Sequence, residues 1–419
     1  FCLASADPRL QQRLMERMLV EGRTIAALLP LPPQGARGLM AFRGLLAAAM
    51  AMPEQTGFMS RFLRYLPAEL ERLVLADGTV IERSPEAQFL VARELAEMSV
   101  MFRTAHATVP PFIDRALDKV CPVLRAMRHG DGGLAVFNGA NERHSAAVED
   151  VLAQGSRQKL IAPAMPQGRF TRLALGKSLL IVDSGPPAPA GFDTTAHAGT
   201  LSFEFSHQRH RLFVNCGSAV IGAWRDAMRS SAAHTVLVAD GLSSADFGPD
   251  GGMTRRPVTV SCDHQTDGTA HWLDLSHDGY HAPLGAKWTR RLYFGADGED
   301  LRGQELIDGE RNIDFAIRVH IHPDVTVTQD DEDIILQVGG TIWRFRQRDG
   351  VVRLENDVYL GRGKREICRQ IIIMPQPVAE VAAPPEGESA PEPEKPAAAQ
   401  KPAKRTHQSV TWLLERIPE

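Results

Sequence analysis

Apolar side chains in the first 155 residues recur three and four positions apart, which is the spacing of an α-helix. The pattern occurs in five segments, near residues 14–19, 39–46, 66–74, 89–95 and 113–127. Clusters of proline, glycine and aspartate separate these segments, such as Pro110-Pro111 and Gly130-Asp131-Gly132-Gly133. Because this spacing puts the apolar side chains of each helix on one face, it predicts helical hairpins stacked side by side. Residues 1–155 are therefore expected to form an all-α domain.

From about residue 165 the apolar pattern changes to a period of two, which is typical of β-strands. Residues 170–175 and 178–182 flank a Gly176-Lys177 turn and predict a hairpin. Nine further short strands are expected at 201–205, 211–214, 235–238, 258–262, 290–294, 315–320, 334–338, 341–345 and 367–374. Many short strands without intervening helices predict an antiparallel β-sandwich over residues 165–374.

The C-terminal region changes composition twice. Residues 375–408 are rich in Pro, Ala, Glu and Lys, a composition that cannot form a core and predicts a disordered linker. Residues 409–419 carry Val410, Trp412 and Leu414 and are expected to form a strand that returns to the sandwich. Pairing at a sheet edge is the favoured interpretation, and a free tail is the alternative.

Charge and cysteine content narrow the function classes. The chain has 47 basic and 51 acidic residues, a net charge of −4, so no global basic field attracts nucleic acid. A polyanionic ligand must therefore meet a local basic cleft. No apolar run approaches the roughly 18–20 residues that span a bilayer. The five scattered cysteines form no CxxC motif, which argues against a disulfide framework.

The beginning of the chain, Phe1-Cys2-Leu3, has neither an initiator Met nor the features of a signal peptide. We expect that N-terminal sequence is missing. Localisation stays open between a bacterial periplasm and a cytoplasm, and the oligomeric state is unknown.

Seven segments form a specific signal when they are taken together and in order, namely residues 77–85, 129–139, 196–203, 224–235, 277–280, 290–293 and 320–325. In these segments the chain resembles the heparinase II/III-like polysaccharide lyases. The resemblance implies an incomplete (α/α) toroid followed by an antiparallel β-sandwich, with a cleft between them for an acidic polysaccharide. Family members cleave uronate-containing chains by β-elimination, which requires no cofactor. The uronate carboxylate must be neutralised by Asn, His or Arg donors while a Tyr or His acts as base and acid.

The sequence departs from the family pattern at several positions. Thr195 replaces a histidine, Asn215 replaces an aspartate, and Ala87 stands where a tyrosine is common. Two hypotheses therefore remain: a lyase, or a catalytically degenerate protein of the same fold that binds glycan or assists envelope assembly.

The resemblance and the residue chemistry together give the candidate site residues. Tyr280, His281 and Asn138 are the predicted catalytic residues, although packing is the alternative for Tyr280 and helix capping for Asn138. The predicted substrate-binding residues are those with donors for carboxylate or sulfate, namely Arg225, Arg229, Arg290, Arg291 and Asn141. Arginines on a sheet edge are also often simply solvated.

Histidines give the candidate metal site. His197, Asn215 and His234 match positions that hold a structural zinc in some relatives, and hydrogen bonding within the sandwich is the alternative for the two histidines. His320 and His322 share one face of an expected strand, where they suit a metal, an acidic substrate or a structural role.

Overall fold

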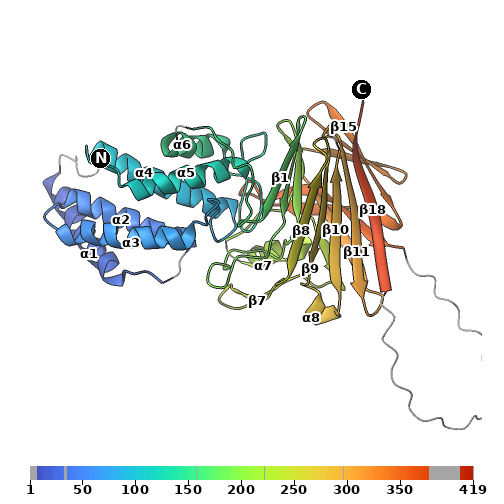
Figure 1. Ribbon diagram of the computed structural model, residues 1–419, viewed down its shortest axis with the longest axis horizontal. Coiled ribbons are helices and arrows are strands. Elements are labelled where there is room, and N and C mark those ends of the chain that lie inside the picture. Colours follow the sequence, from blue (N-terminus) through green and yellow to red (C-terminus); the bar gives the residue numbers. More distant parts are fainter. Residues whose placement is uncertain are drawn as a thin grey trace, which may run out of the picture.

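The N-terminal part of the protein is an open stack of α-helices. The computed structural model describes residues 7–32, 35–156, 158–220, 222–295, 297–376 and 406–418. The helices are α1 (Pro8–Leu28), α2 (Gly38–Ala51), α3 (Thr56–Leu73), α4 (Pro85–Thr104), α5 (Pro111–Ala126) and α6 (Ser145–Gly155). The five helices expected from the apolar spacing are confirmed, and α6 is an additional one. In Figure 1, α1, α2 and α3 form one layer beneath α4, α5 and α6.

Local sequence explains where α4 begins. Ser84 is the N-cap of α4 and its side chain accepts from the backbone N–H of Ala87, while Pro85 occupies the first turn. Leu95 and Phe89 of α4 are buried in one core with Leu45 of α2. None of the helices in the described ranges is long and apolar enough to cross a membrane.

The C-terminal part is a sandwich of two eight-stranded sheets whose strand pairs are all antiparallel. The first sheet has the order β1-β2-β3-β4-β12-β17-β16, with β5 added against β12. Its strands are β1 (Phe170–Leu175), β2 (Ser178–Asp183), β3 (Phe203–His207), β4 (His210–Phe213), β5 (Leu237–Ala239), β12 (Phe315–Ile321), β16 (Gly350–Tyr359) and β17 (Glu366–Pro375).

The second sheet has the order β13-β14-β15-β18-β11-β10-β9-β8. Its strands are β8 (Val260–Thr266), β9 (His271–His277), β10 (Lys287–Phe294), β11 (Asp300–Gly309), β13 (Thr326–Asp330), β14 (Asp333–Val338), β15 (Thr341–Arg348) and β18 (Thr406–Ile417). The core between the sheets is rich in aromatic residues, including Phe203, Phe205, Trp288 and Trp343. The predicted α-then-β architecture is thus confirmed.

Two predictions about the sandwich need correction. Short helices do interrupt the strands, at α7 (Ala223–Arg229) and α8 (His281–Leu284), next to a 3-10 turn over Ser231–Ala233 and a small hairpin of β6 (Asp246–Phe247) and β7 (Met253–Arg255). Strands β9, β11, β13 and β16 were not expected. In β11 the inward positions include Gly303 and Glu305, and these residues hide the apolar alternation.

The C-terminal strand β18 is central rather than at a sheet edge. It pairs with β11 on one side and β15 on the other, so the expected edge position is wrong. Trp412 explains the position, because its ring stacks between Phe203 and Phe345 in the middle of the core. Gly303 faces Trp412 across the β11–β18 pair, where a Cβ atom would lie 2.1 Å from the indole. Of the expected linker, residues 377–405 lie outside the described ranges.

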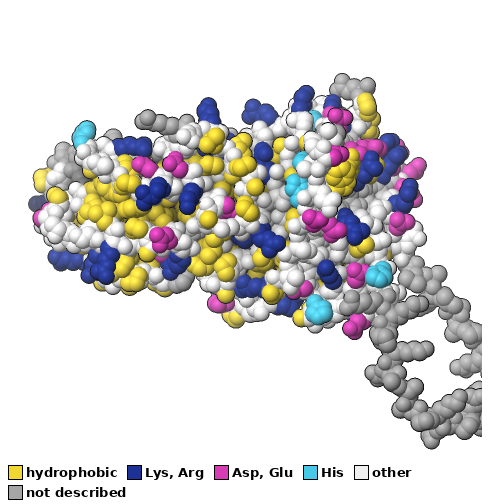
Figure 2. All heavy atoms as spheres, in the orientation of Figure 1, with side chains coloured by type: hydrophobic (Ala, Val, Ile, Leu, Met, Phe, Trp, Pro, Cys, Tyr) yellow, Lys and Arg dark blue, Asp and Glu magenta, His cyan; other side chains and the backbone are white. Residues whose placement is uncertain are grey.

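The surface differs between the two halves. Figure 2 shows hydrophobic side chains gathered over the helical part of the viewed face, whereas charged side chains of both signs are interspersed over the sheets. A groove beside α2 and α4 is lined by Met40 and Val100, which are both exposed.

We expect Trp412→Ala to lower the free energy of unfolding by roughly 3–5 kcal/mol, the usual cost of truncating a buried tryptophan. The indole is 3% exposed and has aromatic rings on both sides. Denaturant unfolding measures the change. Ile367→Ala is the matched control, because Ile367 is 77% exposed and should change stability by no more than about 0.5 kcal/mol. Equal effects of the two substitutions would contradict the central placement of β18.

Candidate functional site

The helical part joins the sandwich through a buried polar network around Asn138. The Asn138 amide donates to the backbone carbonyl of Arg83 (2.9 Å) and to the Asp183 carboxylate (3.1 Å), and its oxygen accepts the backbone N–H of His197 (3.3 Å). The Arg83 guanidinium also pairs with Asp183. The segment before α4, strand β2 and the loop before β3 therefore meet at one amide. Asn138, predicted to be catalytic, has both ends of its amide bonded within the protein.

Tyr280 is in the core, so its assignment as an accessible acid or base is wrong. The residue is 0% exposed, and its hydroxyl donates to the carbonyl of Leu237 at 2.6 Å. Burial raises the pKa of this phenol above its usual range, which disfavours the phenolate that a base would need. The turn at Asp278-Gly279 directs the ring inward, whereas His281 begins α8 at the exposed surface.

Arg290 and Arg229 are structural rather than substrate-binding. Arg290 is 0% exposed, pairs with Glu305 at 2.9 Å and donates to the carbonyls of Leu201 and Thr235, each at 2.7 Å. The alternation along β10 indicates that the Arg290 side chain faces the core, because it is in phase with the buried Trp288.

Arg229 packs over the ring of Phe247 at 3.8 Å and donates to the carbonyls of Ala196 and Gly251. Burial lowers the pKa of Arg229 to about 10. Both guanidinium groups are thus bonded to protein, although the buried Nη2 of Arg290 has no hydrogen-bond partner among the described residues.

The remaining predicted binding residues are scattered. Arg291 is exposed on the outer face of the second sheet and pairs with Asp274 of the neighbouring strand. Arg225 is half-buried in α7. Asn141 accepts the backbone N–H of Ser218 at 2.9 Å and so helps join the two halves. These three residues do not form a common binding surface.

His197 and His234 form a buried pair beside Asn138. His197 Nδ1 lies 3.1 Å from His234 Nε2, and His234 Nδ1 lies 2.8 Å from the carbonyl of Ser230. The carbonyl partner places the His234 proton on Nδ1, so His197 donates to His234 Nε2. Burial lowers the pKa of both rings, for His234 to about 4. The histidines are therefore neutral and satisfied by each other.

This pair fits zinc only in part. Two tetrahedral zinc ligands at about 2.0–2.1 Å would lie about 3.3 Å apart, which is close to the observed separation of the two nitrogens. The third position is Asn215, a neutral amide whose oxygen already accepts the backbone N–H of Thr235 at 3.1 Å. Its Nδ2 is buried and has no hydrogen-bond partner among the described residues. Zinc at His197, Asn215 and His234 stays a prediction.

A basic cleft of about 750 Å³ lies between α5–α6 and the β1–β2 hairpin. Its basic lining residues are Arg125, Arg128, Lys159, Arg172 and Lys177, and Glu149, its one acidic lining residue, pairs with Arg128. The Nε of Arg172 is buried and has no hydrogen-bond partner in the described part of the chain. Burial lowers the pKa of Arg172. This cleft was not predicted from the sequence, because its cations come from separate segments and form no run.

His129 lines the basic cleft and fixes one of its walls through two hydrogen bonds. Its Nδ1 lies 2.8 Å from the hydroxyl of Ser206, and its Nε2 lies 2.8 Å from the Glu204 carboxylate. Glu204 also accepts the backbone N–H groups of Val136 and Asn215. Both ring nitrogens of His129 are thus used to hold helical-side residues against β3.

A partial helical toroid joined to an antiparallel sandwich defines a known class of protein. The profile of the heparinase II/III-like, C-terminal family matches residues 157–413, and the chain belongs to this family. A curated relative, FtsZ-localized protein C of Caulobacter vibrioides, is 27% identical over 361 residues. That alignment covers 81% of this chain and 62% of the relative.

Solved structures share the fold at low sequence identity. A heparinase III crystal structure matches with a TM-score of 0.73 at 11% identity, covering 98% of this chain and 66% of the other. A heparan sulfate lyase from Pedobacter heparinus matches with a TM-score of 0.65 at 12% identity, covering 99% and 65%. At these identities the likeness concerns the fold alone. The chain spans less than two thirds of the length of each relative.

We expect Asn215→Asp to raise the zinc content of the purified protein relative to the unchanged chain. The substitution supplies an anionic oxygen beside two imidazole nitrogens that already have nearly the separation of zinc ligands. Elemental analysis of both proteins measures the difference, which should approach one zinc per chain. Equal zinc in the two proteins would contradict this expectation, because the added carboxylate would then bring no further metal to the histidine pair.

We expect acid to destabilise the protein partly through His277. Burial lowers the pKa of His277 from 6.5 to about 4. At pH values between these two, the imidazole therefore binds a proton in the unfolded chain but not in the folded one. The contribution of the neutral ring to the free energy of unfolding is complete above pH 6.5, and roughly 3 kcal/mol of it is lost as the pH falls to 4. In His277→Phe the loss between pH 7 and 4 should be smaller by about that amount. Denaturant unfolding at both pH values measures it, and equal losses in the two proteins would refute the assignment.

Proposed function

We propose that the protein binds an acidic, uronate-containing polysaccharide in the basic cleft and does not cleave it. The observation that carries the proposal is the convergence of cations on one cleft, among them Arg172, a half-buried guanidinium whose Nε lacks a partner among the described residues. Buried polar groups normally have hydrogen-bond partners, and guanidinium donors match carboxylate and sulfate. Lys159 and Lys177 are exposed at the rim of the same cleft.

The buried acid–base groups argue against β-elimination. A lyase needs a base that reaches the C5 proton of the uronate, together with donors that neutralise its carboxylate. Of the four tyrosines, Tyr280 and Tyr359 are fully buried, and the Tyr359 hydroxyl bonds Glu142 at 2.5 Å. Tyr65 belongs to α3, and Tyr293 contacts Trp272 beside a groove on the outer face of the second sheet.

Lyase activity is the competing proposal, because the names of the solved relatives describe lyases. The curated relative, in contrast, is named for localisation with FtsZ. That name is compatible with a glycan-binding protein that assists envelope assembly, which is the setting we propose for this chain.

The protein is incubated with a panel of uronate polymers, and with neutral polymers as the comparison. Binding and ultraviolet absorbance are measured on the same samples. We expect saturable binding of acidic polymers that weakens as salt is added, without the absorbance of an unsaturated uronate. The double variant Lys159→Glu/Lys177→Glu should weaken binding roughly tenfold, because exposed charge contacts each contribute at most about 1 kcal/mol.

Lys287→Glu is the matched control, because Lys287 is an exposed cation on β10 and does not line the cleft. Its binding should equal that of the unchanged protein. A rise in absorbance on incubation would replace the proposal with the lyase hypothesis. Failure to bind any acidic polymer, or equal weakening by the control, would refute binding at the basic cleft.

A further inference from the structure

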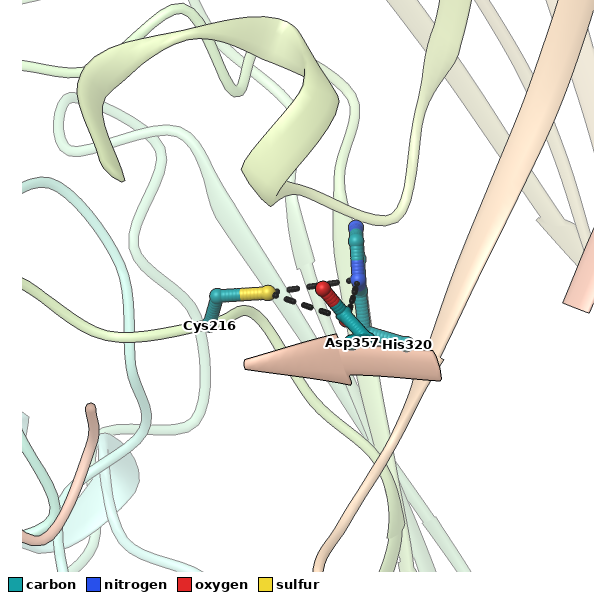
Figure 3. Close-up of side chains that lie close together, drawn as sticks. All are labelled: Cys216, His320 and Asp357. Carbon is teal, nitrogen blue, oxygen red and sulfur yellow. Dashed lines mark hydrogen bonds and ion pairs between the residues drawn. The ribbon is translucent and has the colours of Figure 1, made fainter. Parts of the chain in front are cut away.

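Cys216, His320 and Asp357 converge in the first sheet, next to the junction with the helical part. Cys216 follows β4, His320 lies in β12 and Asp357 lies in β16, so three separate segments supply the side chains (Figure 3). His320 Nδ1 lies 3.2 Å from Cys216 Sγ and 2.6 Å from Asp357 Oδ2, and the sulfur and that oxygen are 3.5 Å apart. In the described ranges they form the one group of three such residues with metal-site spacing.

The hydrogen bond on the far side of the imidazole fixes its tautomer. His320 Nε2 lies 3.0 Å from the backbone carbonyl of His234, an acceptor, so the ring carries its proton on Nε2. In the neutral ring the Nδ1 lone pair then points at a carboxylate oxygen only 2.6 Å away. Two lone pairs at that distance repel each other unless a proton or a metal ion lies between them. A ring N–H bonded to a backbone carbonyl is also the usual support of a metal-binding histidine.

We propose that Cys216, His320 and Asp357 bind a zinc ion. Thiolate, imidazole and carboxylate are all ligands that zinc takes, and the two anionic ligands offset its charge. Tetrahedral zinc with ligand distances of about 2.0–2.3 Å would separate the ligand atoms by about 3.3–3.6 Å. Both distances from the sulfur are near this range, and the nitrogen–oxygen distance would open by about 0.7 Å on binding.

The surroundings provide access and a further thiol. Asp357 is the most exposed of the three side chains, which gives the ion a route from solvent. Cys368 lies opposite Asp357 in the β16–β17 pair, and its thiol interacts with the same carboxylate. The fourth coordination position is therefore open to this thiol or to water.

The site is distinct from the His197–His234 pair. It contains a thiol, which that pair lacks, and it uses His234 only through the backbone carbonyl. Zinc binding would fix the position of Cys216. Two residues further along, the backbone N–H of Ser218 donates to Asn141 of the helical side. The zinc would thus stabilise the segment through which the sandwich contacts the helical part.

Cobalt titration of the full chain, reduced and freed of metal, tests the proposal. Co²⁺ substitutes for zinc and reports a thiolate ligand by a sulfur-to-cobalt charge-transfer band. We expect this band to saturate at one ion per chain and to disappear when Zn²⁺ is added. Cys216→Ser should abolish it. Asp357→Asn should weaken cobalt binding at least about tenfold, since even outer-shell substitutions cost 10–100-fold.

Two control variants separate this site from other groups. Cys262→Ser removes a half-buried thiol that contacts Thr171, and His197→Ala disrupts the His197–His234 pair. Both variants should keep the band. Circular dichroism and thermal unfolding verify the fold of each variant. Absence of the band in the unchanged protein, or its persistence in folded Cys216→Ser, would overturn the proposal. The cluster would then be a His320–Asp357 ion pair beside a thiol.

Discussion

The structure depends on the need to satisfy polar groups buried where the helices meet the sandwich. Asn138, Arg83 and Asp183 are all buried. The Asn138 amide donates to the Arg83 carbonyl and to the Asp183 carboxylate, and the Arg83 guanidinium pairs with that carboxylate. Removing one partner from such a network leaves a buried charge uncompensated, which typically costs 3–5 kcal/mol. The relative position of the two halves is therefore set by directional bonds rather than by apolar packing alone.

The same constraint accounts for much of the chemistry around the junction. Glu142 accepts the Tyr359 hydroxyl and lies 2.9 Å from His322, while the Arg211 guanidinium pairs with Asp131. These residue types are the ones from which a lyase builds its active site, but here they bond one another across the interface. In the described structure these side chains therefore serve to hold the two halves together. The exposed cations Lys159 and Lys177 lie instead on the walls of the basic cleft.

Sequence patterns predicted the helices well because their apolar faces are regular, as along α5. They failed where the inward positions of a strand are filled by special residues. Gly303 in β11 is small because Trp412 occupies the space, and Glu305 is inward because Arg290 faces it. Such pairs are complementary only in three dimensions. No window of β11 alone contains that information.

The candidate site shows the same limit at the level of single residues. Motif resemblance singled out Tyr280, Asn138 and Arg290, yet it could not tell which face of a segment each side chain occupies. Parity along the strand would have placed Arg290 inside, because it alternates in phase with Trp288. Tyr280 lies in a turn, where no periodicity exists to place it. The basic cleft was invisible for a different reason, since its residues adjoin only after the helices pack on β1 and β2.

The neighbouring residues Asn215 and Cys216 show how local chemistry differs on two sides of one segment. Asn215 is neutral and bonds the backbone at Thr235, so the side facing the His197–His234 pair lacks an anion. Cys216 lies close to His320 and the Asp357 carboxylate, so the anionic and sulfur ligands are concentrated there. A divalent cation is held most strongly where charged ligands can compensate it. Charge therefore favours the Cys216 side of the segment, although both sides supply an imidazole nitrogen.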